Sequence, residues 1–179
     1  SLAAGCAPTS QTVRLDPQSP PATMTIGDDA AVALETVDNR ANPALGSLEK
    51  REGPPAEVTT DRDPAYILKL TVAKTLRDYG FRPGLWDDSA QPRLLVGIEK
   101  LNITVDSTLP YDINTEVVLS ARAWRDGKTF EGQATANLSD VSPTRPNAEK
   151  TAGYLNKAIT QALQRLFEDK LPRFLAGRS

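Results

Sequence analysis

The sequence predicts an α+β fold, a two-layer sandwich in which two helices cover one face of a mostly antiparallel sheet of about four strands. Two observations predict it. Apolar residues recur at helical spacing in two segments, which indicates two helices. Four other segments contain short apolar or alternating runs, which indicate strands. These segments follow in the order β-α-β-β-β-α, which packs as two layers around one core. The 179 residues, of which 39% are hydrophobic, suffice for one such core.

The first predicted element is a buried strand, the apolar run from Ala30 to Val37. Residues 38–62 follow as a long connection that contains Pro43, Pro54 and Pro55 together with two glycines. Within this connection, residues 57–60 are expected to add a small edge strand. The whole of residues 23–179 is therefore expected to form one domain.

Two amphipathic helices are predicted from capping residues and apolar spacing. The first begins at Asp63, an N-cap followed by proline at the first helical position, and ends at Gly80. The second runs from about Asn147 to Leu171, and Pro172 is expected to stop it. The predicted core positions of the two helices are Leu68, Val72, Leu76, Tyr79, Leu155, Ile159, Leu163, Leu166 and Phe167.

Three long strands are predicted between the helices. The first, from Pro92 to Val105, changes the parity of its apolar residues and so predicts a bulge near Glu99 and Lys100. The dipeptide Asp126-Gly127 joins the other two, residues 113–125 and 128–138, as a tight hairpin in a defined register. In that register one face is small and apolar, and the opposite face is polar. We expect the helices on the first face and solvent or a partner on the second.

Composition excludes several functional classes. The chain has no histidine, which removes the commonest metal ligand and proton-transfer residue, so we expect neither a metal nor a cofactor and no enzymatic activity. A net charge of −2 without a basic block argues against a nucleic-acid partner. The oligomeric state is left open by composition.

The beginning of the sequence resembles a lipobox. Small and apolar residues precede Cys6, and a proline- and serine-rich segment follows it. We therefore expect residues 1–22 to comprise a signal-peptide remnant, the lipobox and a flexible tether. The resemblance implies lipid, with acyl chains such as palmitate, on Cys6. Ala7 is not the aspartate that retains such lipoproteins at the inner membrane, so the resemblance implies the periplasmic side of the outer membrane.

The order of elements resembles the YajG-type lipoproteins of the bacterial envelope. The residues that carry this resemblance are Asp38-Asn39-Arg40 after the first strand, the helix end at residues 76–81, the long hairpin, and a terminal helix that runs into Phe174-Leu175. The resemblance implies a small envelope lipoprotein and carries over no catalytic residue.

Two candidate sites follow from the predicted register. Arg122, Trp124, Arg125 and Glu131 combine an aromatic ring with charged groups, as contact surfaces often do; the alternative is that Trp124 shields neighbouring side chains. Asp38, Asn39 and Arg40 form a loop site, in which Asp38 and Arg40 either face a ligand or pin the loop as an ion pair. Trp86 is expected to fill the bottom of the core.

The expected function is that of a non-catalytic envelope lipoprotein, which docks to another envelope protein or to the cell wall. The alternative is a carrier of small molecules or lipids with a pocket between helices and sheet. A ligand pocket of this kind needs roughly 300 Å³ or more. An enzyme that uses paired carboxylates would need two acidic side chains that converge in a cleft.

Overall fold

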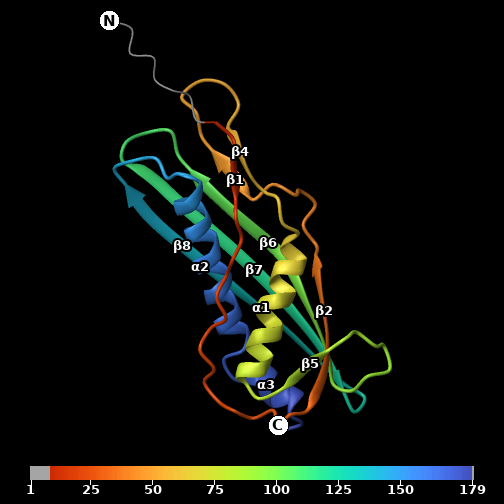
Figure 1. Cartoon of the computed structure of the whole chain (residues 1–179). Helices are drawn as coiled ribbons and strands as arrows, with labels where there is room; N and C mark the ends of the chain where they lie inside the picture. The colour runs from red at the N-terminus through yellow and green to blue at the C-terminus, as the bar shows by residue number, and fades with distance from the viewer. Residues whose placement is uncertain (1–8, 179) are drawn as a thin grey trace, which may run out of the picture.

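A computed structural model describes residues 9–178, and it contains one mixed, curled sheet of eight strands with helices on one face (Figure 1). The strands are β1 (Gln11–Val13), β2 (Ala31–Asp38), β3 (Gly46–Leu48), β4 (Ala56–Thr60), β5 (Arg82–Gly84), β6 (Arg93–Val105), β7 (Tyr111–Arg125) and β8 (Lys128–Ser142). The helices are α1 (Pro64–Asp78), α2 (Ala148–Leu166) and α3 (Lys170–Leu175).

The predicted fold class is wrong, because the sheet is neither four-stranded nor mostly antiparallel. It forms a half-barrel in which β6 pairs in parallel with both β2 and β3, and β2 also pairs in parallel with β5. Further out, β3 pairs with β4, and β4 with β1. Three of these strands, β1, β3 and β5, have only three residues each, which is too short for a periodic pattern to reveal them.

The parallel pairing follows from the helical crossover between β2 and β6. A strand that is followed by a helix and a second neighbouring strand returns in the same direction. Strand β6 has 13 residues, and β2 pairs only with residues 93–98 of it. The remaining edge is therefore free for β3, which pairs with residues 103–105.

The predicted hairpin and bulge are confirmed. Arg125 pairs with Lys128 across the two-residue turn, and β7 and β8 stay paired without interruption over all 15 residues of each strand. The register of β6 against β7 shifts between Ile98 and Lys100, which leaves Glu99 as the extra residue. The side chains therefore alternate as predicted between a helix-covered face and an open face, which we call the outer face.

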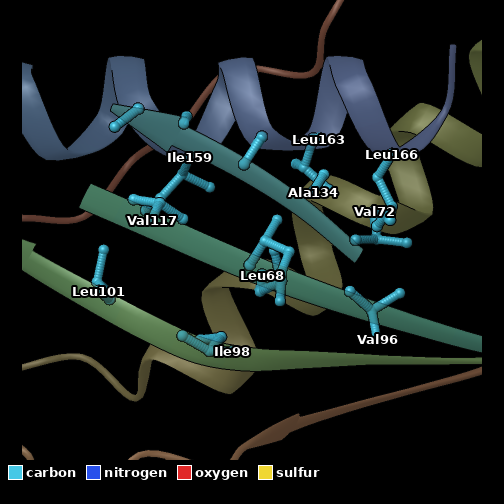
Figure 2. Close-up of a cluster of buried hydrophobic side chains, with 14 of the residues drawn as sticks. Leu68, Val72, Val96, Ile98, Leu101, Val117, Ala134, Ile159, Leu163 and Leu166 are labelled. Carbon is cyan, nitrogen blue, oxygen red and sulfur yellow. The ribbon is translucent and has the colours of Figure 1, made fainter. Parts of the chain in front are cut away.

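Helices α1 and α2 cover the inner face of the sheet. Figure 2 shows apolar side chains of both helices packed among those of β6, β7 and β8, with labelled residues Leu68, Val72, Val96, Ile98, Leu101, Val117, Ala134, Ile159, Leu163 and Leu166. All of these side chains are buried. The predicted cap is present, since the Asp63 side chain accepts a hydrogen bond from the backbone N–H of Ala65.

The terminal helix differs from its prediction. It breaks after Leu166 and restarts as α3, with Pro172 inside α3 rather than beyond its end. Pro172 is the third residue of α3, and the N–H groups of a first helical turn have no acceptor within the helix. Proline is therefore tolerated there.

Residues 11–20, expected to belong to the tether, contribute to the fold. After β1, an extended segment passes between α1 and α2 (Figure 1). Leu15, Pro17 and Pro20 are buried in it. The Thr71 hydroxyl donates a hydrogen bond to the carbonyl of Pro17, and the Asn156 side chain accepts one from the backbone N–H of Asp16 at 2.8 Å. The domain thus begins close to residue 11.

Replacement of Leu15 by alanine tests this assignment. Leu15 is 1% exposed, so the Leu15→Ala variant should lose about 2–5 kcal/mol of unfolding free energy in urea titrations. The matched control is Leu85→Ala, since Leu85 is 89% exposed and its loss should change stability by less than about 0.5 kcal/mol. Equal, small effects would show that residues 11–20 do not belong to the folded domain.

Candidate functional site

A polar groove of about 520 Å³ lies on the outer face of the sheet. Four strands contribute to it, in the spatial order β2, β6, β7 and β8 (Figure 1). Its apolar floor and polar rim come from residues far apart in the sequence, namely Val37, Asn39, Leu95, Gly97, Ser120, Ala121, Arg122, Glu131, Gly132 and Gln133. Its volume falls within the range of roughly 300–1,000 Å³ that is typical of ligand sites. We call it the outer-face groove.

A three-residue polar cluster borders the outer-face groove above Gly97. The Glu99 carboxylate accepts a hydrogen bond of 2.7 Å from the Asn39 amide and one of 2.6 Å from the Ser120 hydroxyl. The bulge places Glu99 at this position, which is a common use of bulges near functional sites. A Cβ on Gly97 would lie 2.6 Å from the Ser120 Oγ and 2.7 Å from the Glu99 carboxylate. Only glycine therefore leaves room for the cluster.

The predicted surface around Trp124 is only partly assembled. Arg122 and Glu131 line the outer-face groove, and the Arg122 Nε donates a hydrogen bond of 2.8 Å to the Glu131 carboxylate. Trp124 lies on the same face, two residues further along β7. Arg125 has the opposite parity and donates a hydrogen bond to the carbonyl of Leu175 at the end of α3. The structure thus brings Arg122, Trp124 and Glu131 together and separates Arg125 from them.

Sequence reasoning misplaced Trp86 and did not single out Arg93. Trp86 does not fill the core: it meets Trp124 edge-on, with ring centroids 6.0 Å apart. The Arg93 guanidinium lies 4.7 Å from the centre of the Trp124 ring, which is within cation–π range. Arg93 is paired with Trp124 in the β6–β7 register, so the predicted parity of β6 would have placed it on this face.

The loop site separates into two parts. Asn39 belongs to the polar cluster at the outer-face groove, whereas Asp38 and Arg40 form an ion pair of 2.7 Å. The Arg40 side chain is only 7% exposed, and it also donates hydrogen bonds to the carbonyls of Ala44 and Leu101. It therefore fills the gap along β6 between the end of β2 and the start of β3.

The Asp38 carboxyl has a lowered pKa. Burial by itself raises this pKa, but the hydrogen bonds from Arg40 and the charge of its guanidinium together lower it below the ordinary value. Asp38 is thus held ionised by its partner. These contacts are those of an ion pair that pins the loop.

The space between helices and sheet is filled. The cavity there has a volume of about 10 Å³, and apolar residues line it, among them Leu15, Leu68 and Ile159. A cavity of this size holds about one water molecule. The outer-face groove is therefore the better candidate for a binding site.

Cys6, the predicted site of lipid attachment, lies outside the described residues. Across residues 9–178, no helix combines the length and apolar character needed to cross a membrane.

The chain belongs to a family described as uncharacterized lipoproteins, whose model matches residues 17–175. The bacterial lipoprotein class that was predicted from the sequence is thereby shown, and this class is associated with the cell envelope. Among curated proteins, none matches the chain.

One solved structure supports the fold, and two others are more distantly similar. A Xanthomonas campestris protein of the DUF330 family superposes with a TM-score of 0.56 at 14% identity, covering 89% of this chain and 91% of that one. A PelC dodecamer from Paraburkholderia phytofirmans matches with a TM-score of 0.40 at 14% identity over 85% of this chain and 95% of that one. The lipoprotein GNA1162 from Neisseria meningitidis matches with a TM-score of 0.36 at 13% identity, over 76% of this chain and 99% of that one.

Removal of Arg40 should destabilise the fold. The Arg40→Ala variant leaves Asp38 half-buried without its partner and should lose roughly 3 kcal/mol of unfolding free energy at pH 7. Because the folded pKa of Asp38 is lowered, the stability that the pair contributes is present above about pH 4 and is lost as the pH falls through that lowered value. The difference in urea midpoint between wild type and Arg40→Ala should therefore shrink below about pH 4.

Arg122→Ala is the matched control, because it removes an ion pair whose arginine side chain is 56% exposed. It should change the unfolding free energy by less than about 1 kcal/mol. If the two variants lose the same free energy, Arg40 does not pin the loop.

Proposed function

We propose that this protein is a non-catalytic, YajG-type lipoprotein that is anchored by lipid on Cys6 to the periplasmic side of the outer membrane, where it docks to another envelope protein or to the cell wall. The observation that carries the proposal is the outer-face groove. It is a concavity of about 520 Å³ with an apolar floor and a polar rim, on a sheet whose other face is covered by helices. Membership of the lipoprotein family supports the anchor.

The position of β1 indicates which end of the domain would lie near the membrane. Gln11, the first residue of β1, is five positions after Cys6 in the sequence, and an extended chain spans at most about 3.6 Å per residue. The end of the domain that contains β1 would therefore stay within about 18 Å of the anchor. The end of β7 that contains Trp124 lies far from β1 in Figure 1. The neighbouring Arg125 bonds to the end of α3, so Trp124 would be distant from the membrane.

The anchor is tested by intact mass and membrane fractionation. The protein is expressed with a complete export signal in a gram-negative host, beside a Cys6→Ala variant. Wild type should carry acyl mass on a chain that begins at Cys6 and should fractionate with the outer membrane, whereas the variant should be unmodified and soluble. Unmodified, soluble wild type would overturn the anchor.

The docking face is tested by site-specific photo-crosslinking in the same host. A photoreactive amino acid replaces Arg122 or Glu131 on the outer face, and the control replaces Lys74 of α1, whose side chain is 62% exposed. Discrete adducts should form from the two outer-face positions, depend on Cys6, and be absent from the control. Adducts from all three positions, or from Lys74 alone, would contradict docking through the outer face.

A further inference from the structure

Hydrogen-bonding groups at the outer-face groove are left without protein partners. Among the hydrogen bonds between described residues, Asn39 and Ser120 both reach the same oxygen of Glu99, and both bonds from Arg122 reach the same oxygen of Glu131. The second oxygen of each carboxylate and the whole Gln133 amide are unused by these bonds. The groove therefore offers free acceptors and an unpaired amide to a ligand that carries many donors.

The charge of the groove disfavours anions. The lining carries one carboxylate, that of Glu131, and one guanidinium, that of Arg122, and these two are already paired with each other. The carboxylate of Glu99 lies at the border of the groove and adds a negative charge there. A phosphate or carboxylate ligand would need an excess of positive charge, as in sites where arginine side chains clamp it. Neutral ligands rich in hydroxyl groups meet no such barrier.

The floor of the groove adds a small apolar surface beside these amides. Val37 and Leu95 are half-buried there on the outer face, and Gly97, two residues after Leu95 in β6, presents no side chain. This surface is too small for a lipid chain, but it matches a methyl group. An acetamido group has the required combination of a methyl with one donor and one acceptor, which the amides of Asn39 and Gln133 complement.

We propose that the outer-face groove binds a neutral glycan of N-acetylated amino sugars. The acetyl methyl lies on Val37 and Leu95, its amide pairs with Asn39 or Gln133, and ring hydroxyls donate to the unused carboxylate oxygens of Glu99 and Glu131. This inference rests on the proposed docking function, and it selects the cell-wall side of that proposal over a protein partner. Gly97 and the bulge at Glu99 are then specificity-determining features of the chain.

The test uses isothermal titration calorimetry of the full chain with chitotetraose, a tetramer of N-acetylglucosamine. Cellotetraose, which has the same linkage without acetamido groups, is the comparison ligand. Chitotetraose should bind, and cellotetraose should bind at least about tenfold more weakly. The hydrogen bonds of the acetamido group should contribute on the order of 1.4 kcal/mol of binding free energy, which corresponds to a tenfold change in affinity. Equal affinity for the two sugars, or no binding of chitotetraose, would overturn the inference.

Single variants test whether chitotetraose binds in the groove or elsewhere on the outer face. Asn39→Ala and Gln133→Ala should each weaken chitotetraose binding about tenfold. The control Asn137→Ala removes an exposed amide on the same strand, four residues beyond Gln133 and outside the groove, and should bind as wild type does. Urea midpoints equal to wild type establish that each variant folds. Binding that is undiminished in Asn39→Ala and Gln133→Ala would place the sugar elsewhere and reject the groove.

The two proposals fail in distinguishable ways. If photo-crosslinks from Arg122 and Glu131 capture only protein and chitotetraose does not bind, the glycan is excluded while the docking face is retained. If Asn39→Ala weakens chitotetraose binding but the outer-face positions give no adducts in cells, the groove binds sugar and the proposed docking function is wrong.

Discussion

The rest of the structure depends on the pairing of β6, because this strand is longer than β2 and β3, which share one of its edges. One edge is filled by β7 along nearly its full length, whereas the other edge is shared by β2 and β3. The shared edge leaves a gap in the backbone ladder, and unpaired backbone carbonyls there would be costly without a donor. The buried guanidinium of Arg40 supplies donors to the carbonyls of Ala44 and Leu101. Its charge is balanced by Asp38, so the gap is closed.

The same strand creates the candidate site. The extra residue at Glu99 turns its carboxylate toward the outer face, and the absence of a side chain on Gly97 gives the cluster of Asn39, Glu99 and Ser120 its room. The helices pack on the apolar inner face, whereas the outer face carries the polar side chains that form the rim of the groove. Structure and candidate function are therefore divided between the two faces, with the core on one and the groove on the other.

A lipid anchor on Cys6, as proposed above, would lie close to the folded domain, because the domain begins near residue 11. The extended residues that follow β1 are packed between α1 and α2 and hydrogen-bonded to both helices. A lipid anchor on Cys6 would therefore hold the domain within a short distance of the membrane rather than on a long flexible linker. Such confinement raises the effective concentration of the groove for ligands near that surface.

Local chemistry in the sequence determined several features by itself. Asp126-Gly127 set the hairpin register residue by residue, the change of parity in β6 located the bulge, and Asp63-Pro64 marked the start of α1. Each depends on residues adjacent in the chain, so each was predictable, and with them the shared face of Arg122, Trp124 and Glu131.

Only the tertiary structure decided the parallel pairing of β6 with β2 and β3, the three-residue strands, and the union of Asn39 with Gln133 in one groove. Pairing between distant segments depends on which edges remain free after the long strands have paired, and no local pattern encodes that competition.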